Sequence, residues 1–266
     1  MQLTKHHGLG NDFLIGFVAE QPSNASDLAR QLCHRTEGIG ADGLVLLVPH
    51  TEADARMVLH NADGSRAEIS GNGLRCVGQA LAIDGGVDAA SFVVMTDAGP
   101  RLVAVEPGAG VLTAMVDAEM GEVTAIDPPP RDAEELAASL VDAQRVGSGA
   151  IGNPHIVVEV TDPSAIDLAL VGPVVEHAVP SGTNVEFIAA SGDDSIDLTA
   201  WERGSGITQA CGSGACVGAV LANRWGLTGT RVRVGMPGGS ATVEVGPTVH
   251  LIGPATLVAR IEVPDV

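Results

Sequence analysis

The chain has 266 residues, of which 45% are apolar, and a formal net charge of −19 from 33 acidic and 14 basic residues. This length suits one large domain or two small ones with a buried core, and no apolar run approaches the roughly 20 residues of a membrane span. The excess of acidic residues repels phosphate backbones and anionic lipids, which argues against nucleic acid and membranes as partners. The N-terminus has neither a signal-peptide nor a transit-peptide pattern, and we expect a cytoplasmic protein.

In the first half of the chain, helical and extended segments follow one another closely. A helix is predicted over 24–33 and a strand over 43–48, where a β-branched run is bounded by small and polar residues. A Gly-Asn-Gly turn then precedes an apolar segment that predicts a helix over about 72–83. Further β-branched runs predict strands over 91–95 and 101–105.

The second half begins with a Pro-rich segment at 126–131, which cannot join a central strand and is interpreted as a surface connection. A helix is predicted over 132–143 with Asp132 as its N-cap, followed by a strand over 155–160. A Gly-Ser-Gly turn precedes a second apolar helix, predicted over about 213–223, and a strand is predicted over 231–234.

The two halves repeat one plan. Residues 61–81 and 201–221 each pass from an extended polar segment through a Gly-polar-Gly turn into an apolar helix, and an offset of 141 aligns Ser70 with Cys211. A second match, with an offset of 142, places Asn11 opposite Asn153. Matching order and spacing indicate an internal duplication. We therefore expect an α+β fold of two pseudo-symmetric lobes, with a cleft between them.

The repeated turn is suited to binding an anion. A helix start presents unpaired N–H groups and the positive end of the helix dipole, and glycine lets a ligand approach the backbone. Cys211 immediately precedes one such start, where the pKa of a thiol is expected to be lowered. Two groups on opposite faces of an α-carbon whose carboxylate is held in this way could remove a proton and return one, which inverts the configuration.

The sequence lacks the residues that several other kinds of catalytic or binding site require. Lys5 is the only lysine and lies in a predicted strand, which argues against a pyridoxal phosphate enzyme. The chain has no zinc-ligand spacing, phosphate-binding loop or dinucleotide fingerprint, so neither a metal nor a cofactor is expected. The other three cysteines, Cys33, Cys76 and Cys216, are interpreted as small core residues with reduced thiols.

The chain contains the segments HGLGNDF (7–13), GIGADG (38–43), NADGSRAEISGNGLRC (61–76), GNPH (152–155), GTNVEF (182–187), ERGSGITQACGSGAC (202–216) and MPGG (236–239). In these segments it resembles the diaminopimelate epimerase family, and the resemblance extends over nearly its whole length. The resemblance implies epimerisation of LL-2,6-diaminopimelate to meso-diaminopimelate, in lysine and peptidoglycan-precursor synthesis, without metal or coenzyme. It also implies a homodimer of two-lobed subunits, each lobe a mostly antiparallel sheet or barrel around a central helix. The expected lobes are 1–116, to which the last strand (about 255–266) returns, and 117–254.

The resemblance also assigns site residues. Cys211 and Ser70 occupy the two proton-transfer positions, and His155 and Glu202 match the polar partners that tune the thiols. The positions that match the family's substrate-binding residues are Asn11, Asn61, Gly71, Asn72, Asn153, Asn184, Glu202, Arg203, Gly212 and Ser213. Arg203 suits a distal carboxylate, because its planar guanidinium binds a carboxylate with two parallel hydrogen bonds.

Two positions depart from the family pattern. Ser70 stands where the family has its first catalytic cysteine, and a hydroxyl is much less acidic than a thiol, although serine is a good helix N-cap. Gly43 stands where some members carry a glutamine that touches substrate. The leading hypothesis is an epimerase in which Ser70 completes the transfer begun by Cys211. The alternatives are an inactivated cysteine-to-serine variant, a related racemase, epimerase or dehydratase for another amino acid, and an amino-acid-binding protein without catalysis.

Overall fold

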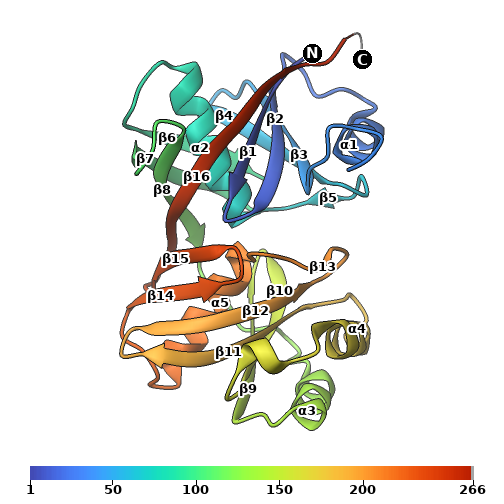
Figure 1. Ribbon diagram of the computed structural model, residues 1–266, viewed down its shortest axis with the longest axis vertical. Coiled ribbons are helices and arrows are strands. Elements are labelled where there is room, and N and C mark those ends of the chain that lie inside the picture. The colour runs from blue at the N-terminus through green and yellow to red at the C-terminus, as the bar shows by residue number, and fades with distance from the viewer. Residues whose placement is uncertain (265–266) are drawn as a thin grey trace. The chain divides into compact units, whose positions relative to one another are not determined.

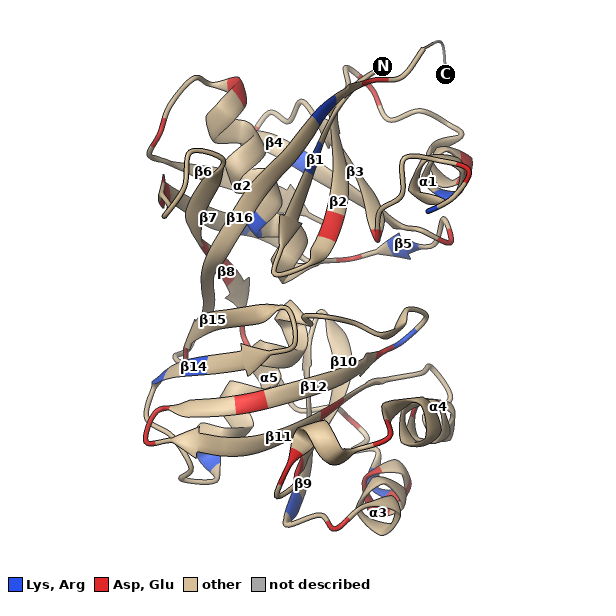
Figure 2. Ribbon diagram, in the orientation of Figure 1, with Lys and Arg blue, Asp and Glu red and all other residues tan. Residues whose placement is uncertain are grey.

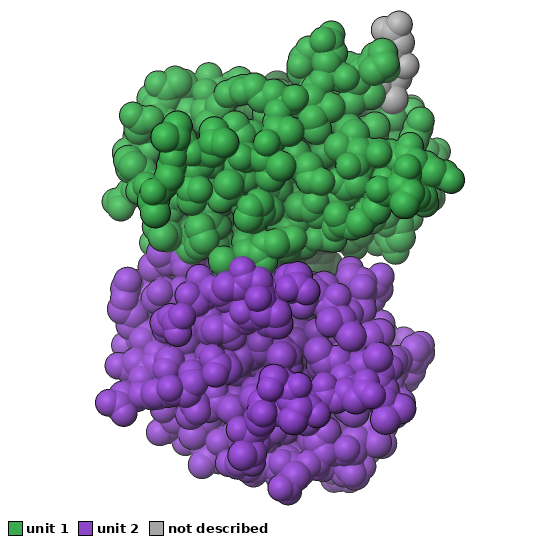
Figure 3. Space-filling view, in the orientation of Figure 1, with its two compact units in different colours: residues 1–119, 253–266 green, residues 120–252 purple. Residues whose placement is uncertain are grey.

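A computed structural model describes residues 1–264 and confirms an α+β fold with two compact units (Figures 1 and 3). Unit 1 comprises Met1–Glu119 together with the chain from Gly253 onward, and unit 2 comprises Met120–Ile252. The last strand, β16 (Val249–Glu262), begins in unit 2 and ends in unit 1. Acidic and basic residues are scattered over the described part of both units without a block of one sign (Figure 2).

Unit 1 is a closed barrel built around one helix. Eight strands follow one another in the order β1-β2-β3-β4-β6-β7-β8-β16, and β16 closes the ring by pairing antiparallel with β1. Most neighbours are antiparallel, but β2–β3 and β4–β6 are parallel. The elements are β1 (Gln2–Gly8), β2 (Asn11–Phe17), α1 (Ala25–Cys33), β3 (Gly43–Val48), β4 (Ala55–Asn61), β5 (Arg66–Ala67), α2 (Gly71–Asp84), β6 (Ala90–Thr96), β7 (Gly99–Pro107) and β8 (Thr113–Gly121).

Unit 2 has the same order of elements after two additions. Its strands follow the order β9-β10-β11-β12-β14-β15-β16, with β10–β11 and β12–β14 parallel. The elements are α3 (Arg131–Leu140), β9 (Arg145–Ile151), β10 (Asn153–Glu159), the 3₁₀ turn η1 (Pro163–Ala165), α4 (Leu168–Ala178), β11 (Asn184–Gly192), β12 (Ser195–Glu202), β13 (Gly206–Ile207), α5 (Gly212–Arg224), β14 (Arg231–Met236) and β15 (Gly239–Glu244).

The central helices are α2 in unit 1 and α5 in unit 2. Most residues of both are apolar, and each helix is buried along most of its length, as expected for a helix inside a core. Gly78 allows α2 to lie against β7, because a Cβ atom there would meet Val103 Cγ1 at 2.5 Å. The sheet therefore holds each helix at a fixed position, with its N-terminus and the preceding turn at the end of the core.

The strand registers confirm the internal duplication. In unit 1 Phe13 pairs with Gly43 across parallel strands, and in unit 2 His155 pairs with Asn184 across the equivalent strands. The short strands β5 and β13 then pair with β4 and β12 just before the two central helices. Each unit thus brings the start of its central helix, its second strand and its fourth strand into one place.

Two details differ from the sequence-based expectations. Asp132 is not an N-cap: α3 starts at Arg131 after Pro130, no side chain caps it, and Asp132 lies in its first turn. The helix α4 was missed because Pro173 lies inside it, but Asp167 caps its start and Val171 and Val175 anchor its apolar face. Across residues 1–264, no helix is long and apolar enough to cross a membrane.

Candidate functional site

The two turns predicted to bind an anion both open a central helix. Cys211 is the N-cap of α5, and its Sγ accepts the Gly214 N–H at 3.3 Å. Ser70 is the N-cap of α2, and its Oγ accepts the Gly73 N–H at 3.0 Å. Each cap therefore takes up one of the exposed N–H groups of its helix, as N-cap side chains do. The next residues, Gly71-Asn72 and Gly212-Ser213, are the first of their helices and are buried or nearly so.

A buried histidine–carboxylate pair lies beside Cys211. Parallel pairing of β10 and β11 puts His155 opposite Asn184, so Glu186, two residues further along β11, lies on the same face of the sheet. His155 Nδ1 donates to Glu186 Oε1 at 2.7 Å, and both side chains are fully buried. The ring's other nitrogen, Nε2, lies 2.9 Å from Asn153 Oδ1. His155 and Asn153 were predicted as site residues, and the structure brings them together.

Glu186 was not predicted from the sequence. It lies within the GTNVEF segment, and a charged residue inside an otherwise apolar strand was the available signal. Gly214 makes room for it, because a Cβ atom at that position would collide with the Glu186 carboxyl group. The first turn of α5 and the carboxylate on β11 are therefore packed directly against each other.

Glu202 ends β12 and forms the second carboxyl group of the cluster. Thr208 Oγ1 donates to Glu202 Oε1 at 2.5 Å. Burial, opposed by that hydrogen bond and assisted by the nearby charge of Glu186, raises the pKa of Glu202 from 4.5 to about 7. A carboxyl group with this pKa exchanges its proton readily near neutral pH, so it is suited to general acid–base chemistry.

The prediction of a lowered pKa for Cys211 was wrong. Burial, reinforced by the negative charges of Glu202 and Glu186, raises its pKa well above 9.0 and outweighs the hydrogen bonds from Ser213 and Gly214. The helix N-terminus still contributes the Gly214 N–H, but burial together with the two nearby carboxyl groups outweighs it. The raised pKa therefore favours the thiol form of Cys211 over the thiolate.

His155, Glu186 and Cys211 could also ligate a metal ion, since their ligand atoms all lie within 4.8 Å of one another. Both ring nitrogens of His155 are already engaged, however, by Glu186 and Asn153. An ion would have to break one of these contacts before it could bind the imidazole. The arrangement thus fits a network of proton-carrying groups better than it fits a preformed metal site.

Asn184 is buried opposite His155, and its side chain connects to Arg203. The Asn184 side chain donates to Pro154 O at 3.0 Å and accepts the Arg203 backbone N–H at 2.9 Å. The Arg203 side chain is exposed, and its Nη1 donates to Ser181 O at 3.0 Å. Within residues 1–264, the guanidinium forms no ion pair with a carboxylate. It is therefore available to bind an external one.

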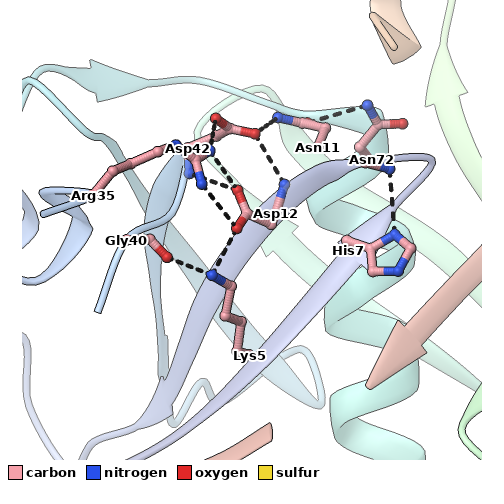
Figure 4. A network of polar contacts seen from close by, with 9 residues as sticks. Lys5, His7, Asn11, Asp12, Arg35, Gly40, Asp42 and Asn72 are labelled. Carbon is pink, nitrogen blue, oxygen red and sulfur yellow. Dashed lines mark hydrogen bonds and ion pairs between the residues drawn. The ribbon is translucent and has the colours of Figure 1, made fainter. Parts of the chain in front are cut away.

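In unit 1 the structure joins two of the three predicted asparagines. Asn72 Nδ2 donates to Asn11 Oδ1 at 3.1 Å, and Asn11 Nδ2 donates to Asp42 Oδ2 at 2.7 Å (Figure 4). Asn61, at the end of β4, instead donates to Ser65 Oγ at 3.0 Å. Asp42 was not predicted, although it lies in the GIGADG segment beside the predicted departure at Gly43.

The remaining cysteines and the single lysine have structural roles. Cys33, Cys76 and Cys216 are buried free thiols, as predicted, and burial raises the pKa of Cys33 and of Cys76 to about 12. Lys5 Nζ pairs with Asp12 at 2.8 Å and donates to Gly40 O at 2.6 Å. These groups do not belong to either helix-start site.

Comparison with known proteins identifies the family of the chain. The family model described as diaminopimelate epimerase matches residues 3–126 and 148–258. The chain is 40% identical over 279 residues to the diaminopimelate epimerase of Pelotomaculum thermopropionicum, with 99% of each chain covered. It is 34% identical over 275 residues to that of Synechocystis sp., with 96% of each covered.

Solved structures with the same fold are more distant in sequence. A predicted epimerase from Pseudomonas aeruginosa superposes with a TM-score of 0.76 at 15% identity, covering 100% of this chain and 99% of that one. A hydroxyproline epimerase from Agrobacterium vitis, with bound trans-4-hydroxy-L-proline, gives 0.70 at 17% identity, covering 99% and 90%. At these identities the likeness concerns the fold alone.

Proposed function

The chain belongs to the diaminopimelate epimerase family, and we propose on that basis that it inverts one α-carbon of 2,6-diaminopimelate and so interconverts the LL and meso isomers. The reaction removes one proton from the α-carbon and adds one proton to its opposite face, with no change in oxidation state. It serves lysine and peptidoglycan-precursor synthesis. The main support from the structure is the buried thiol of Cys211 at the start of α5, next to a carboxyl group whose pKa is about 7.

Cys211 is assigned as one proton-transfer group. Because its thiol is protonated at rest, it delivers a proton to the α-carbanion and becomes a thiolate. Glu202 then returns a proton to the sulfur, which its pKa near 7 allows. In the opposite direction the thiolate takes the α-proton. His155, fixed by Glu186 on one side and Asn153 on the other, contributes an oriented imidazole to the same cluster.

The helix starts are assigned to the substrate carboxylate next to the reacting carbon. Backbone N–H groups at Gly71-Asn72 and Gly212-Ser213 carry the positive ends of the two helix dipoles. These dipoles stabilise the negative charge that develops as the α-proton leaves. Asn11, Asn61, Asn153, Asn184, Glu202 and Arg203 are proposed to hold the rest of the substrate, with Arg203 on the distal carboxylate.

Ser70 is proposed as the second proton-transfer group, acting through water or a polar neighbour because its own hydroxyl is a weak acid. NMR in deuterated buffer tests this. The purified protein is given LL-diaminopimelate and, separately, the meso isomer, and both deuterium at C2 and inversion are followed. We expect both signals from either isomer. Ser70→Ala should stop inversion, and Cys211→Ala should stop exchange from the isomer that Cys211 deprotonates.

Exchange from only one isomer, without inversion, would show that Cys211 works alone and would refute the role of Ser70. Binding without any exchange would refute catalysis altogether. If Ser70 is instead an inactivating replacement, Ser70→Cys should restore inversion to a protein that otherwise shows none.

A related amino-acid racemase, epimerase or dehydratase is the second candidate, because a single thiol base without a second thiol also suits one-sided proton removal. The exposed guanidinium of Arg203 favours a substrate with a second carboxylate. A panel of hydroxyproline, proline and diaminopimelate distinguishes them. Turnover of proline derivatives but not of diaminopimelate would favour the second candidate.

The proposal also includes a homodimer in the cytoplasm. Light scattering on the purified protein should give twice the mass of 26.9 kDa. A monomeric mass at micromolar concentration would contradict the dimer. Fractionation of expressing cells tests the location.

A further inference from the structure

A chain of side-chain hydrogen bonds in unit 1 has a fixed direction. It runs from Arg75 to Asn72, from Asn72 to Asn11, and from Asn11 to Asp42; Figure 4 shows the part from Asn72 onward. Arg75 Nη2 donates to Asn72 Oδ1, Asn72 Nδ2 donates to Asn11 Oδ1 at 3.1 Å, and Asn11 Nδ2 donates to Asp42 Oδ2 at 2.7 Å. The three links connect α2, the start of β2 and the loop before β3.

The chemistry of the two ends sets this direction. A guanidinium has only donors and a carboxylate only acceptors, whereas a carboxamide has both and can be turned around. Beginning from Arg75, the oxygen of Asn72 must face the guanidinium, so its nitrogen faces Asn11. Beginning from Asp42, the nitrogen of Asn11 must face the carboxylate, so its oxygen faces Asn72. The two requirements agree, and reversing either amide would set two donors or two acceptors against each other.

We propose that Asp42 and Arg75 are positioning residues that fix the amide orientation of Asn11 and Asn72 for substrate binding. The inference rests on the proposed function, which assigns both asparagines to the substrate. Only one of the two amide hydrogens of Asn11 is used by Asp42, and the other is presented to the substrate. The half-site in unit 1 therefore presents an N–H donor at a defined place and selects a substrate group that accepts a hydrogen bond.

Both ends of the chain are firmly held. The Arg75 side chain is fully buried, and its Nη1 donates to Pro254 O at 2.9 Å on β16. Gly8 leaves room for it, because a Cβ atom there would lie 3.1 Å from Arg75 Nη2. A buried guanidinium is costly unless it is hydrogen-bonded, so its position is strongly determined.

Asp42 is held by the other half of the network in Figure 4. Its Oδ2 also accepts the Asp12 N–H at 3.0 Å, and its Oδ1 accepts from Arg35 Nη2 at 2.7 Å. Arg35 bridges to Asp12, whose carboxylate also pairs with Lys5. Two cations thus neutralise two carboxylates, which allows Asp42 to remain an acceptor beside Asn11.

The substitutions Asp42→Ala and Asp42→Asn distinguish a positioning role of Asp42 from a general effect on the stability of the protein. Alanine removes the acceptor, whereas asparagine retains one oxygen that can accept from Asn11. We expect Asp42→Ala to lower kcat/KM for diaminopimelate about 10-fold or more, as loss of a hydrogen bond to a charged group does. We expect Asp42→Asn to restore it to within about threefold of the wild type. The matched control is Asp97→Ala, which removes another carboxylate of unit 1 that pairs with arginines, Arg56 and Arg66.

Side-chain amide NMR with ¹⁵N-labelled asparagine reports on the orientation of the Asn11 carboxamide and does not require turnover. The Asn11 carboxamide signals should shift and exchange faster with solvent in Asp42→Ala but not in Asp97→Ala. Unchanged Asn11 signals, or kinetics in which Asp42→Asn is as impaired as Asp42→Ala, would overturn the inference. A wild-type protein that turns over no diaminopimelate would instead refute the proposed function, while the NMR comparison would still test the orientation of Asn11.

Discussion

Replacing Glu202 by glutamine should change how the stability of the protein depends on pH. In the folded protein the pKa of Glu202 is raised from its ordinary value of 4.5 to about 7, mainly by burial. Because the folded state holds this proton more tightly than the unfolded state, the group favours folding at low pH. That contribution is fully present below about pH 4.5 and is lost as the pH rises through 7.

The size of the effect follows from the pKa difference. Each factor of ten in proton affinity corresponds to about 1.4 kcal/mol, so the change from 4.5 to about 7 amounts to at most about 3 kcal/mol. Glutamine has the same shape and can still accept from Thr208, but it does not titrate. The free energy of unfolding of the wild type, minus that of Glu202→Gln, should therefore fall by about 3 kcal/mol between pH 4.5 and 7 and then level off.

Urea unfolding at half-unit steps from pH 4 to 8.5 measures this difference, and subtraction removes groups that titrate identically in both proteins. Glu135→Gln, which replaces an exposed glutamate of α3, is the matched control. A flat difference for Glu202→Gln, or one that rises with pH, would refute a raised pKa. Glu202 would then be an ordinary carboxylate, unsuited to return a proton to Cys211.

Three further substitutions test other parts of the site. Ser70→Cys should raise kcat by about 100-fold or more, because a thiol is far more acidic than a hydroxyl; an unchanged rate by circular dichroism assay would contradict this. Glu186→Gln should lower the pKa of Cys211, because the substitution removes a nearby negative charge. The pKa is measured from the thiolate absorbance near 240 nm as a function of pH. Gly214→Ala forces a methyl group against Glu186 and should cost about 1–3 kcal/mol of stability with a loss of activity. Its control is Gly218→Ala on the same helix, where the nearest atom is the flexible Leu198 Cδ1 at 3.2 Å.

Much of the fold could be predicted from local patterns. The Gly-polar-Gly turns and the apolar segments after them predicted α2 and α5, and the offset of 141 predicted two equivalent units. These features are visible because a fully buried helix is apolar on every side and a duplicated chain repeats its spacing. The helix α4 was less visible, since its apolar face is interrupted by Pro173.

The chemistry of the site could be predicted only in part. Sequence motifs indicated Cys211 and Glu202, but the raised pKa of each depends on burial and on their distance from Glu186, which only the tertiary structure sets. The role of Glu186 itself follows from the parallel pairing of β10 with β11, a register that no local pattern fixes. Asp42 was missed for the same reason, because its partner Asn11 is 31 residues away in the chain.

The duplication preserved the backbone, but only unit 2 has a histidine and glutamates at the strand positions beside the helix cap. By the strand registers, His155, Glu186 and Glu202 of unit 2 correspond to Phe13, Val45 and Asn61 of unit 1. Cys211 therefore has carboxyl groups nearby that can exchange protons with it.

The Ser70 hydroxyl accepts the Gly73 N–H, and no titratable side chain in residues 1–264 hydrogen-bonds to it. Restoring a thiol at position 70 would raise the acidity of that group, but it would not supply the proton acceptors that unit 2 has. The two halves of the reaction should therefore differ in rate even in a Ser70→Cys protein, because the asymmetry lies in the strands around each turn as well as in the residue that caps the helix.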